Sequence, residues 1–494
     1  MTHVDSPPYR IVIGLEVHVQ LKTASKLFCS CATTFGSQPN TQTCPVCLGL
    51  PGALPVLNGR AIELAVRTGL ALHCQIPPLT KWDRKQYFYP DLPKGYQISQ
   101  FDLPICAGGF LEIPAAEGAG GKRPVHLVRA HLEEDAGKSM HDESAGVQET
   151  RIDLNRCGTP LLEIVTRPEM HSAEEARLFL SELKLLLTHL DVSDCEMQEG
   201  SLRVDANVNL HVNDGENIAA TPIVEIKNMN SFRAVQRAIE YEVARQYEDW
   251  KQTRATTRTG AKQTRGWDDV RQVTFLQREK EESADYRYFP DPDLLPVTLT
   301  TSWIEEIAKG LGELPADIRH RLEAEYGIKA YDAEVIVNQG REGIAYFETL
   351  ARHAGAAKRA SAWFQQDLLR TLKERNLTFS ALPSAAELGE LLRRVEGGLL
   401  ENARARDVFQ HMLDSSCTVD QATAALGIVG VDASEIEALC QRLVEENPSI
   451  VSQIRGGKMQ AIGALMGQAK KINPDANSQL VRETLLRRIE SSAQ

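Results

Sequence analysis

The stretch Tyr9-Arg-Ile-Val-Ile-Gly-Leu-Glu-Val-His-Val-Gln-Leu21 decides how the first part of the chain folds. Every second residue from Ile11 onward is apolar, and Glu16, His18 and Gln20 alternate with them. This period of two predicts a β-strand with one face in the core and one polar face. Residues two apart on one strand face lie roughly 6.5–7 Å apart, so Glu16 and His18 could address one metal ion or phosphate group. An ordinary strand with a solvated polar face explains this segment equally well.

The same alternation returns in four later segments, which predicts a largely antiparallel sheet. A solvated sheet face would explain the pattern without any function, but such a face is usually rich in Lys, Glu, Thr and Ser. This face is instead rich in side chains that bind metals and phosphates. The predicted polar face carries Arg129, His131 and Glu133; Asp153 and Asn155; Arg203, Asp205, Asn207 and Asn209; and Glu225 and Lys227, whereas Val128, Ala130, Leu132 and Glu134 are predicted on the opposite face.

Composition limits the classes of protein to consider. The chain has 494 residues, a net charge of −12, 42% hydrophobic and 25% charged residues, which is typical of a globular protein of about three domains. An acidic chain can bind nucleic acid only through a local basic patch or through shape. Residues 1–8 show no signal peptide, and no apolar run is long enough to span a membrane. We therefore expect a cytoplasmic protein without a membrane segment.

Two closely spaced cysteine pairs, Cys29/Cys31 and Cys44/Cys47, predict a zinc site. Four thiolates can enclose zinc in a tetrahedron and leave no open position for chemistry, so the expected role is structural. Four incidental buried thiols are one alternative, and a Cys-x-x-Cys redox centre is another.

The order of elements predicts an α+β fold, with a β-rich antiparallel cradle, an all-helical domain and a small helical tail. Helices are expected at 59–72, 173–190 and 232–251, and the Thr-rich segment 251–271 is expected to be a mobile loop. From Trp303 onward the apolar period changes to 3.6. The predicted domains are 1–295, 296–410 and 411–494. Basic residues gather in the tail, among them Lys458, Lys470 and Lys471, which indicates either RNA binding or a solvated helix face.

The polar sheet face suggests phosphoryl chemistry. The sequence has no Walker loop, no Rossmann glycine fingerprint and no Gly-x-Ser-x-Gly elbow. A few carboxylates beside a histidine suit magnesium, which binds together with water and substrate phosphates. Nearby cations could then neutralise a transferring phosphoryl group. The predicted metal ligands are Glu16, His18, Glu133 and Glu225, and the predicted cations are Lys85, Arg129, Arg156 and Lys227.

Several long motifs, in the right order, resemble the B subunits of the glutamyl/aspartyl-tRNA amidotransferases. The resemblance covers nearly the whole chain, including 447–485 in the tail. The segment Gln263-Thr-Arg265 departs from the family pattern, which weakens only statements about the 251–271 region. The motifs are Ile13–Leu21, Phe35–Asn58, Asp83–Gln100, His131–Lys138, Glu225–Phe232 and Asp285–Pro290.

The resemblance implies a function in the indirect synthesis of Gln-tRNA(Gln) and Asn-tRNA(Asn). A member of this family would use ATP and Mg²⁺ to phosphorylate the side-chain carboxylate of Glu-tRNA(Gln) or Asp-tRNA(Asn). Ammonia liberated from glutamine by an amidase (glutaminase) subunit would then displace the phosphate, in a heterotrimer completed by a small third subunit. The tail would bind the tRNA, and the cysteines would hold a structural Zn²⁺.

The resemblance also implies roles for single residues. Glu16, His18, Glu133 and Glu225 match the catalytic metal and nucleotide site, with Arg129, Arg156 and Lys227 near the phosphates. The side chains that resemble the lining of the ammonia route are Lys85, Lys94 and Glu134.

Two alternative functions remain. A non-catalytic tRNA-binding scaffold could have kept the fold. A hydrolase could use the zinc, although four thiolates leave the metal no open position.

Overall fold

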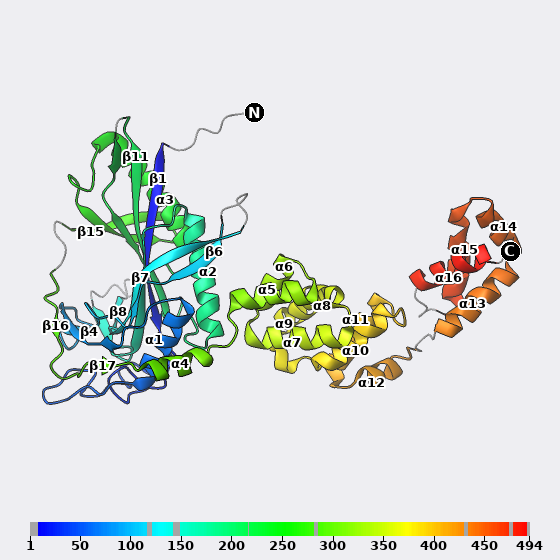
Figure 1. The fold of residues 1–494 in the computed structure, drawn as a ribbon, viewed down its shortest axis with the longest axis horizontal. Helices are drawn as coiled ribbons and strands as arrows, with labels where there is room; N and C mark the ends of the chain where they lie inside the picture. The colour runs from blue at the N-terminus through cyan, green and yellow to red at the C-terminus, as the bar shows by residue number, and fades with distance from the viewer. Residues whose placement is uncertain are drawn as a thin grey trace. The chain divides into compact units, whose positions relative to one another are not determined.

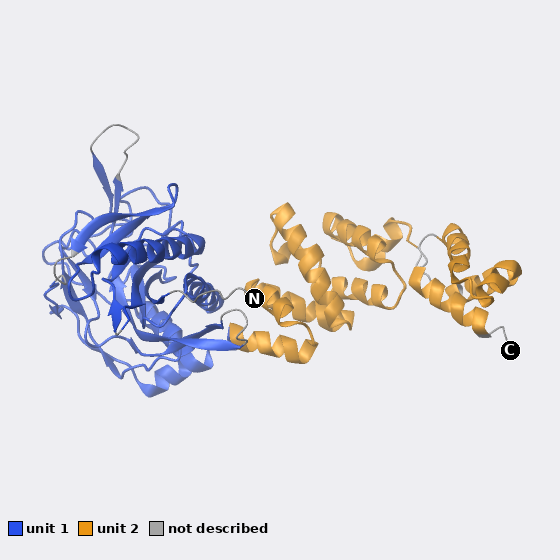
Figure 2. Cartoon of the chain, turned by 90° about the horizontal axis from the view of Figure 1, so that it is seen from above, with its two compact units in different colours: residues 1–314 blue, residues 315–494 orange. Residues whose placement is uncertain are grey.

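A computed structural model gives the structure of the chain and describes residues 8–115, 121–141, 149–215, 217–280, 285–428, 433–473 and 478–491. Contacts between residues divide it into two compact units, Met1–Leu314 and Pro315–Gln494 (Figure 2). Residues 1–7, where the sequence predicts no signal peptide, lie outside the described part.

The first unit is built on one large sheet around β1 (Tyr9–Gln20) (Figure 1). Its other strands are β5 (Cys106–Ala107), β6 (Phe110–Pro114), β7 (Lys122–Glu134), β10 (Pro160–Thr166), β11 (Leu202–Asn213), β12 (Ile218–Ala220), β13 (Val224–Lys227), β14 (Lys262–Asp268) and β15 (Val273–Lys280). The order is β15-β14-β13-β11-β1-β10-β7-β5, with β12 beside β11 and β6 beside β7. The strands pair antiparallel except for the parallel pair β13/β14, so the sheet is mixed.

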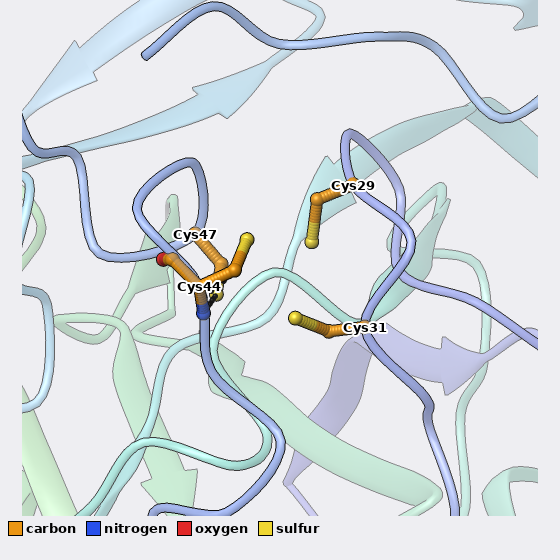
Figure 3. Close-up of side chains that lie close together, drawn as sticks. All are labelled: Cys29, Cys31, Cys44 and Cys47. Atoms are coloured by element: carbon orange, nitrogen blue, oxygen red, sulfur yellow. Dashed lines mark hydrogen bonds between the residues drawn. The ribbon is translucent and has the colours of Figure 1, made fainter.

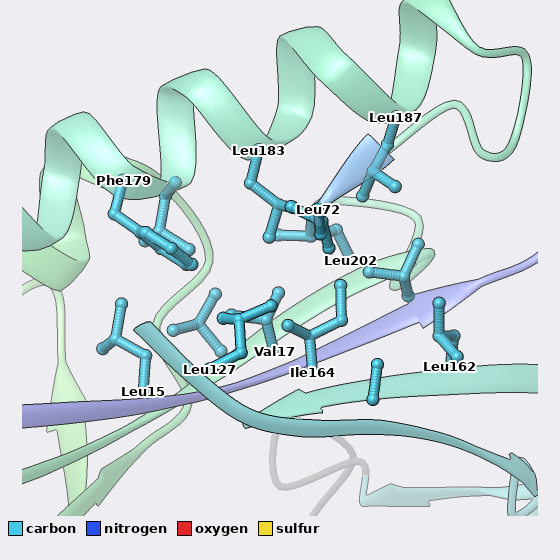
Figure 4. Packing of buried hydrophobic residues seen from close by; sticks show 14 of the residues in the cluster. Leu15, Val17, Leu72, Leu127, Leu162, Ile164, Phe179, Leu183, Leu187 and Leu202 are labelled. Atoms are coloured by element: carbon cyan, nitrogen blue, oxygen red, sulfur yellow. The ribbon is translucent and has the colours of Figure 1, made fainter. Parts of the chain in front are cut away.

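The apolar face of β1 lies in the core, as its alternation predicts. Ile13, Val17 and Val19 are completely buried, whereas the polar residues between them remain partly accessible. Helix α2 (Ala173–His189) covers this face with Phe179 and other apolar side chains (Figure 4). Burying each such side chain contributes about 1.5–3 kcal/mol, so the sheet and helix stabilise each other.

The helices of the first unit begin where their sequence places an N-cap. Ser172 Oγ accepts a hydrogen bond from the Glu175 backbone N–H at 3.1 Å, which satisfies one free donor of the first turn of α2. Ser231 caps its helix in the same way through Ala234 N–H, at 3.0 Å. The other helices of the unit are α1 (Gly59–Ala71), α3 (Phe232–Thr253) and α4 (Thr301–Lys309), and its small sheets contain β2 (Leu79–Thr80) with β17 (Val297–Thr298), β8 (Lys138–His141) with β9 (Thr150–Asp153), and β3 (Asp83–Gln86) with β4 (Tyr96–Ser99) and β16 (Phe289–Pro290).

Two predictions about the first unit are wrong. Segment 251–271 is not a loop throughout, because its second half contains β14, which pairs with both β13 and β15. Val128 does not face the core and is 49% exposed. The register of β7 shifts opposite Val165 and Thr166, and this bulge puts two consecutive residues of β7 out of the simple alternation.

The second unit is helical throughout its described residues, apart from turns and connections, which confirms the α+β class. Its last helices share a hydrophobic cluster that includes Ile436, Leu465 and Leu485. Residues 296–314 belong with the first unit by contact, and the division into three domains stays a prediction. The elements are α5 (Pro315–Tyr326), α6 (Ala330–Val337), α7 (Gly340–Ala354), α8 (Ala357–Trp363), the π-helix η2 (Phe364–Leu368), α9 (Leu369–Arg375), η3 (Phe379–Ala381), α10 (Ala385–Glu396), α11 (Asn402–Ser415), α12 (Val419–Ala425), α13 (Ala433–Glu446), α14 (Pro448–Arg455), η4 (Met459–Ala461), α15 (Ile462–Ile472) and α16 (Ser478–Ser491).

Candidate active site

Strand register brings three adjacent strands together at a first ligand group, His18, Glu133 and Glu163. Glu163 on β10 lies opposite His18 on β1 and opposite His131 on β7. The Glu163 carboxylate is 3.5 Å from His18 Nε2 and 3.3 Å from His131 Nε2. The ligand atoms of the group all lie within 4.8 Å of one another, so they could hold one cation.

The charged side chains in and beside this first group shift one another's pKa values. Burial alone would lower the pKa of His18, but the nearby Glu163 carboxylate outweighs it and raises the pKa to about 9. The pKa of His131 is raised for the same reason. In Glu163, burial opposes ionisation, yet His131 and His18 hold the pKa of the carboxyl well below its usual range. Without a metal, the raised pKa values of His18 and His131 favour protonated imidazoles beside the carboxylates of Glu163 and Glu133.

A second ligand group contains Glu16, Asp205 and Glu225, from β1, β11 and β13. Burial raises the pKa of Glu16, and the carboxylates of Glu163, Asp205 and Glu225 raise it further. Asn207 Nδ2 donates to Glu16 at 3.0 Å, while its buried Oδ1 has no hydrogen-bond partner among the described residues. Crowded carboxylates and a spare amide oxygen fit a hard cation such as magnesium.

The four ligands predicted from the sequence therefore lie on one face but in two groups, with Glu16 and His18 two residues apart on β1. Sequence reasoning did not identify Glu163 at all. It placed Asp205 and His131 on the correct face without assigning them as ligands. The signal for Glu163 was its position between buried Leu162 and Ile164, although the apolar residues that open β10 obscure that alternation.

The predicted cations lie in different places around the two groups. Lys227 Nζ forms ion pairs with Asp205 and, at 3.0 Å, with Glu225. Burial lowers the pKa of Lys85, but the charges of Glu133, Tyr288 and Glu163 outweigh this and raise it.

Two of the predicted cations, Arg129 and Arg156, donate hydrogen bonds to backbone carbonyls. Arg129 donates to the Phe101 carbonyl at 2.6 Å. Arg156 donates to the carbonyls of Ala136 and Gly137, at 2.8 and 2.6 Å. These bonds hold both guanidinium groups on loop carbonyls rather than on the carboxylates of the two ligand groups. Their role at the phosphates stays a prediction.

Lys94 and Glu134 form a buried ion pair, with side chains 5% and 4% exposed. Glu134 also accepts the Ile98 backbone N–H at 3.2 Å. Burial lowers the pKa of Lys94, but Glu134 outweighs it and raises the pKa. The Lys85 Nζ lies 4.9 Å from the centroid of the Tyr286 ring. The role of Lys85, Lys94 and Glu134 in an ammonia route stays a prediction.

The four cysteines Cys29, Cys31, Cys44 and Cys47 meet from two loops, with their sulfur atoms turned toward one another (Figure 3). The sulfurs lie within 4.8 Å of one another, which fits a tetrahedral thiolate site for zinc. Lys26 is completely buried, and its Nζ is 3.8 Å from Cys47 Sγ. A buried cation beside four thiols would offset part of the negative charge of a zinc–thiolate centre.

The basic residues predicted to bind RNA are exposed in the tail. Lys470 and Lys471 lie in the last turn of α15, and Lys458 precedes η4. Lys470 Nζ is also 3.6 Å from a carboxylate oxygen of Glu401. None of the described helices is long and apolar enough to cross a membrane.

Comparisons with known proteins cover almost the entire chain. A family model described as the GatB/GatE catalytic domain matches residues 11–305, and one described as the GatB domain matches residues 345–489. The aspartyl/glutamyl-tRNA(Asn/Gln) amidotransferase B subunit of Rhodopirellula baltica is 64% identical over 481 residues, which are 97% of this chain and 96% of that protein. The proteins of the same name from Moorella thermoacetica and Caldicellulosiruptor bescii are 44% and 43% identical, covering 97% and 98% of this chain and 100% and 99% of theirs.

Proposed function

We propose, since this chain belongs to the family of aspartyl/glutamyl-tRNA(Asn/Gln) amidotransferase B subunits, that it activates and amidates the acidic side chain of Glu-tRNA(Gln) or Asp-tRNA(Asn). The proposed activation uses ATP to phosphorylate the side-chain carboxylate. This step is needed because a carboxylate is a poor electrophile without a good leaving group. Ammonia then displaces the phosphate and leaves Gln-tRNA(Gln) or Asn-tRNA(Asn).

The observation that carries this proposal is the pair of ligand groups on one sheet face. Together they place five carboxylates and the His18 imidazole on this face, with His131 paired to Glu163 and Lys227 paired to Glu225. Such a density of acids fits hard cations better than a solvated surface, where like charges would separate. A scaffold that only binds tRNA has no need of them.

In the proposed mechanism, the two groups would hold magnesium and the predicted cations would hold the phosphates. Glu133, Glu163 and His18 would be ligands at one end of the face, and Glu16 and Glu225 at the other. Magnesium, when bound, would neutralise charge on the phosphates of ATP. Lys227 is aimed at the second group and would stabilise the transferring phosphoryl group, as such cations do in other phosphotransferases. Arg129 and Arg156 would orient the rest of the nucleotide or substrate.

The ammonia would come from an amidase (glutaminase) partner, in a heterotrimer that also contains a small third subunit. Lys94 and Glu134 would line its route toward the sheet face, and Lys85 would lie at the end of that route. Their buried polar groups offer hydrogen-bond partners to a small polar molecule away from bulk water.

The tail and the cysteines would have supporting roles. Lys458, Lys470 and Lys471 would contact the tRNA backbone, where side chains read charge and shape rather than base sequence. Zinc at the four cysteines would be structural, since no ligand position is left for a substrate.

Reconstitution of the complex tests the proposal. The full-length chain would be combined with its two partner subunits, Glu-tRNA(Gln), glutamine, Mg²⁺ and radiolabelled ATP, and release of ADP and formation of Gln-tRNA would be followed. We expect Glu133→Gln and Glu225→Gln to reduce both rates by at least about 100-fold, because even groups that only support metal ligands contribute 10–100-fold. The exposed Glu112 on β6 provides the control Glu112→Gln, with near wild-type rates expected.

The same experiment distinguishes a catalytic role from that of a scaffold that only binds tRNA. A scaffold would form Gln-tRNA equally well with Glu133→Gln, and that result would remove the catalytic assignment. Loss of ADP release with retained tRNA binding supports activation on this face.

A further inference from the structure

The second unit contains a cavity of about 690 Å³ that the proposed chemistry does not use. We call it the helical cavity. It lies between the end of α5, the start of α8 and the beginning of α11. Its wall combines cationic and aromatic side chains, chiefly Lys358, Arg359, Arg406, Tyr326 and Trp363. This combination differs from the apolar lining that is usual for small-molecule pockets.

The two arginines are held in place by carboxylates. Arg406 donates to Asp367 through Nε at 2.8 Å and Nη2 at 3.2 Å, and the Asp367 side chain is 3% exposed. Arg359 forms an ion pair with Glu396 and donates to Asn402 Oδ1 at 3.3 Å. Each guanidinium keeps further N–H donors beyond these bonds. A fixed arginine loses little side-chain entropy when it binds an anion.

Lys358 adds a charge that these carboxylates do not balance. Its side chain is exposed, and the described residues provide no ion pair for it. Lys358, Arg359 and Arg406 carry three positive charges against the two negative charges of Asp367 and Glu396, and Arg370 also pairs with Asp367, at 3.2 Å. This excess is a local property of an otherwise acidic chain.

The aromatic part of the wall is also fixed. Tyr326 is half-buried and packs edge-on against Phe347, with ring centroids 5.6 Å apart. Trp363 is 4% exposed and packs edge-on against Phe409. Tyr326, which is more accessible than Trp363, is therefore the ring that can contact a ligand in the cavity.

We propose that the helical cavity binds a nucleotide, with the phosphate at Lys358 and Arg359 and the base against Tyr326. Cations beside an aromatic wall are the combination that binds single-stranded nucleotides. The volume exceeds what a single water or inorganic anion needs. The nucleotide belongs to the tRNA substrate, an assignment that rests on the proposed function. An acidic peptide would use the cations but not the aromatic wall.

Binding of the full-length chain to Glu-tRNA(Gln) over a range of salt concentrations tests this inference. We expect Lys358→Gln to weaken binding about threefold or more and to reduce the slope of log affinity against log salt by about 0.7–0.9, the loss of one phosphate contact. Lys373, an exposed lysine in α9 outside the cavity, supplies the control Lys373→Gln. We expect this control to retain wild-type affinity.

A second pair of variants tests the aromatic wall. Tyr326→Leu should weaken tRNA binding about fivefold or more without changing the salt slope, whereas Tyr326→Phe should bind as wild type does. Circular dichroism would verify that Tyr326→Leu is folded. Equal tRNA binding by Lys358→Gln and Lys373→Gln would overturn the inference.

Two further measurements identify the source of the nucleotide and distinguish failure of the cavity assignment from failure of the proposed function. If Lys358→Gln weakens binding of AMP or of poly-glutamate but not of tRNA, the assignment to tRNA is wrong. If the wild-type chain binds no tRNA, the proposed function itself fails. If wild type binds tRNA and the cavity variants bind it equally well, the cavity assignment alone fails.

Discussion

Glu163 connects two histidines that the sequence places on different strands. Its carboxylate lies 3.5 Å from His18 and 3.3 Å from His131, and all three side chains are largely buried. Such a carboxylate determines whether the imidazoles are charged. Its removal should therefore change proton binding as well as chemistry.

We predict that Glu163→Gln makes stability in metal-free buffer less dependent on pH. The pKa of His18 is raised from 6.5 to about 9, so protonated His18 stabilises the fold fully below pH 6.5. This contribution is lost as the pH rises toward about 9. The free energy of unfolding in urea should therefore fall more for wild type than for the variant when the pH is raised from about 6 to about 9.5.

The chain offers a matched control for this substitution. Glu169 lies 2.7 Å from His126, but their side chains are 36% and 47% exposed, so the pair is screened by water. Glu169→Gln should show the pH dependence of wild type. If Glu163→Gln and Glu169→Gln show the same pH dependence of the free energy of unfolding, the buried Glu163 pairs contribute no more to it than the exposed pair does.

Residue-level reasoning from the sequence found the polar face but not its grouping. Alternation in β1 placed Glu16 and His18 on one face, which is correct, because side-chain direction is fixed within a strand. The structure nevertheless places the two residues in different ligand groups. Which residues meet across strands depends on register, and register is set by tertiary pairing that one strand does not encode. Glu163 therefore appeared only when β10 was aligned with both β1 and β7.

At the scale of elements, the two cysteine loops meet at four thiols that could bind one metal ion. We predict that the purified chain carries about one zinc ion and that Cys44→Ser carries almost none, as measured by elemental analysis. The variant should also be more easily cleaved by protease between residues 28 and 48, because loop closure depends on the metal. Cys417→Ser, which changes a thiol in the second unit, should retain the zinc. Equal zinc contents in the two variants would contradict a four-cysteine site.

Strand β14 shows why a polar segment can be an internal strand. Its composition resembles a loop, but one of its faces is turned toward the carboxylates and needs polar side chains. Thr264 is 2% exposed and donates to Glu225 Oε2 at 3.0 Å. Hydrophobic patterning cannot identify such a strand, because the buried side chains on this face form hydrogen bonds with neighbouring strands instead of apolar contacts.

We predict that Thr264→Val destabilises the first unit by about 1–3 kcal/mol, because it removes a donor from a buried carboxylate oxygen while the shape is preserved. Urea denaturation measures this change. The exposed Thr257, in the same Thr-rich segment, gives the control Thr257→Val, for which we expect less than about 0.5 kcal/mol. A similar small effect at both positions would show that the Thr264 hydrogen bond contributes little.

At the scale of the whole molecule, the change from period two to period 3.6 correctly predicted where strands give way to helices. It did not determine which helix belongs to which core. Helix α4 follows the last strand and has helical periodicity, yet Ile307 packs in the core of the first unit. Periodicity reports the local conformation of a segment, whereas the core that it joins depends on contacts far away in the sequence.

The separate hydrophobic clusters lead to a prediction about the whole chain. The first unit has its own core around β1 and α2, and the last helices of the second unit share a cluster of their own. A fragment that ends at Leu314 keeps α4 packed on the core of the first unit. A fragment that ends at residue 295 lacks α4 and therefore loses Ile307 from that core. We therefore expect fragment 1–314 to unfold cooperatively on heating and fragment 1–295 to be less stable, by about 1.5–3 kcal/mol or more for each lost apolar side chain. Fragment 315–494 should fold by itself. Equal stability of fragments 1–295 and 1–314 would show that α4 contributes nothing to the first core.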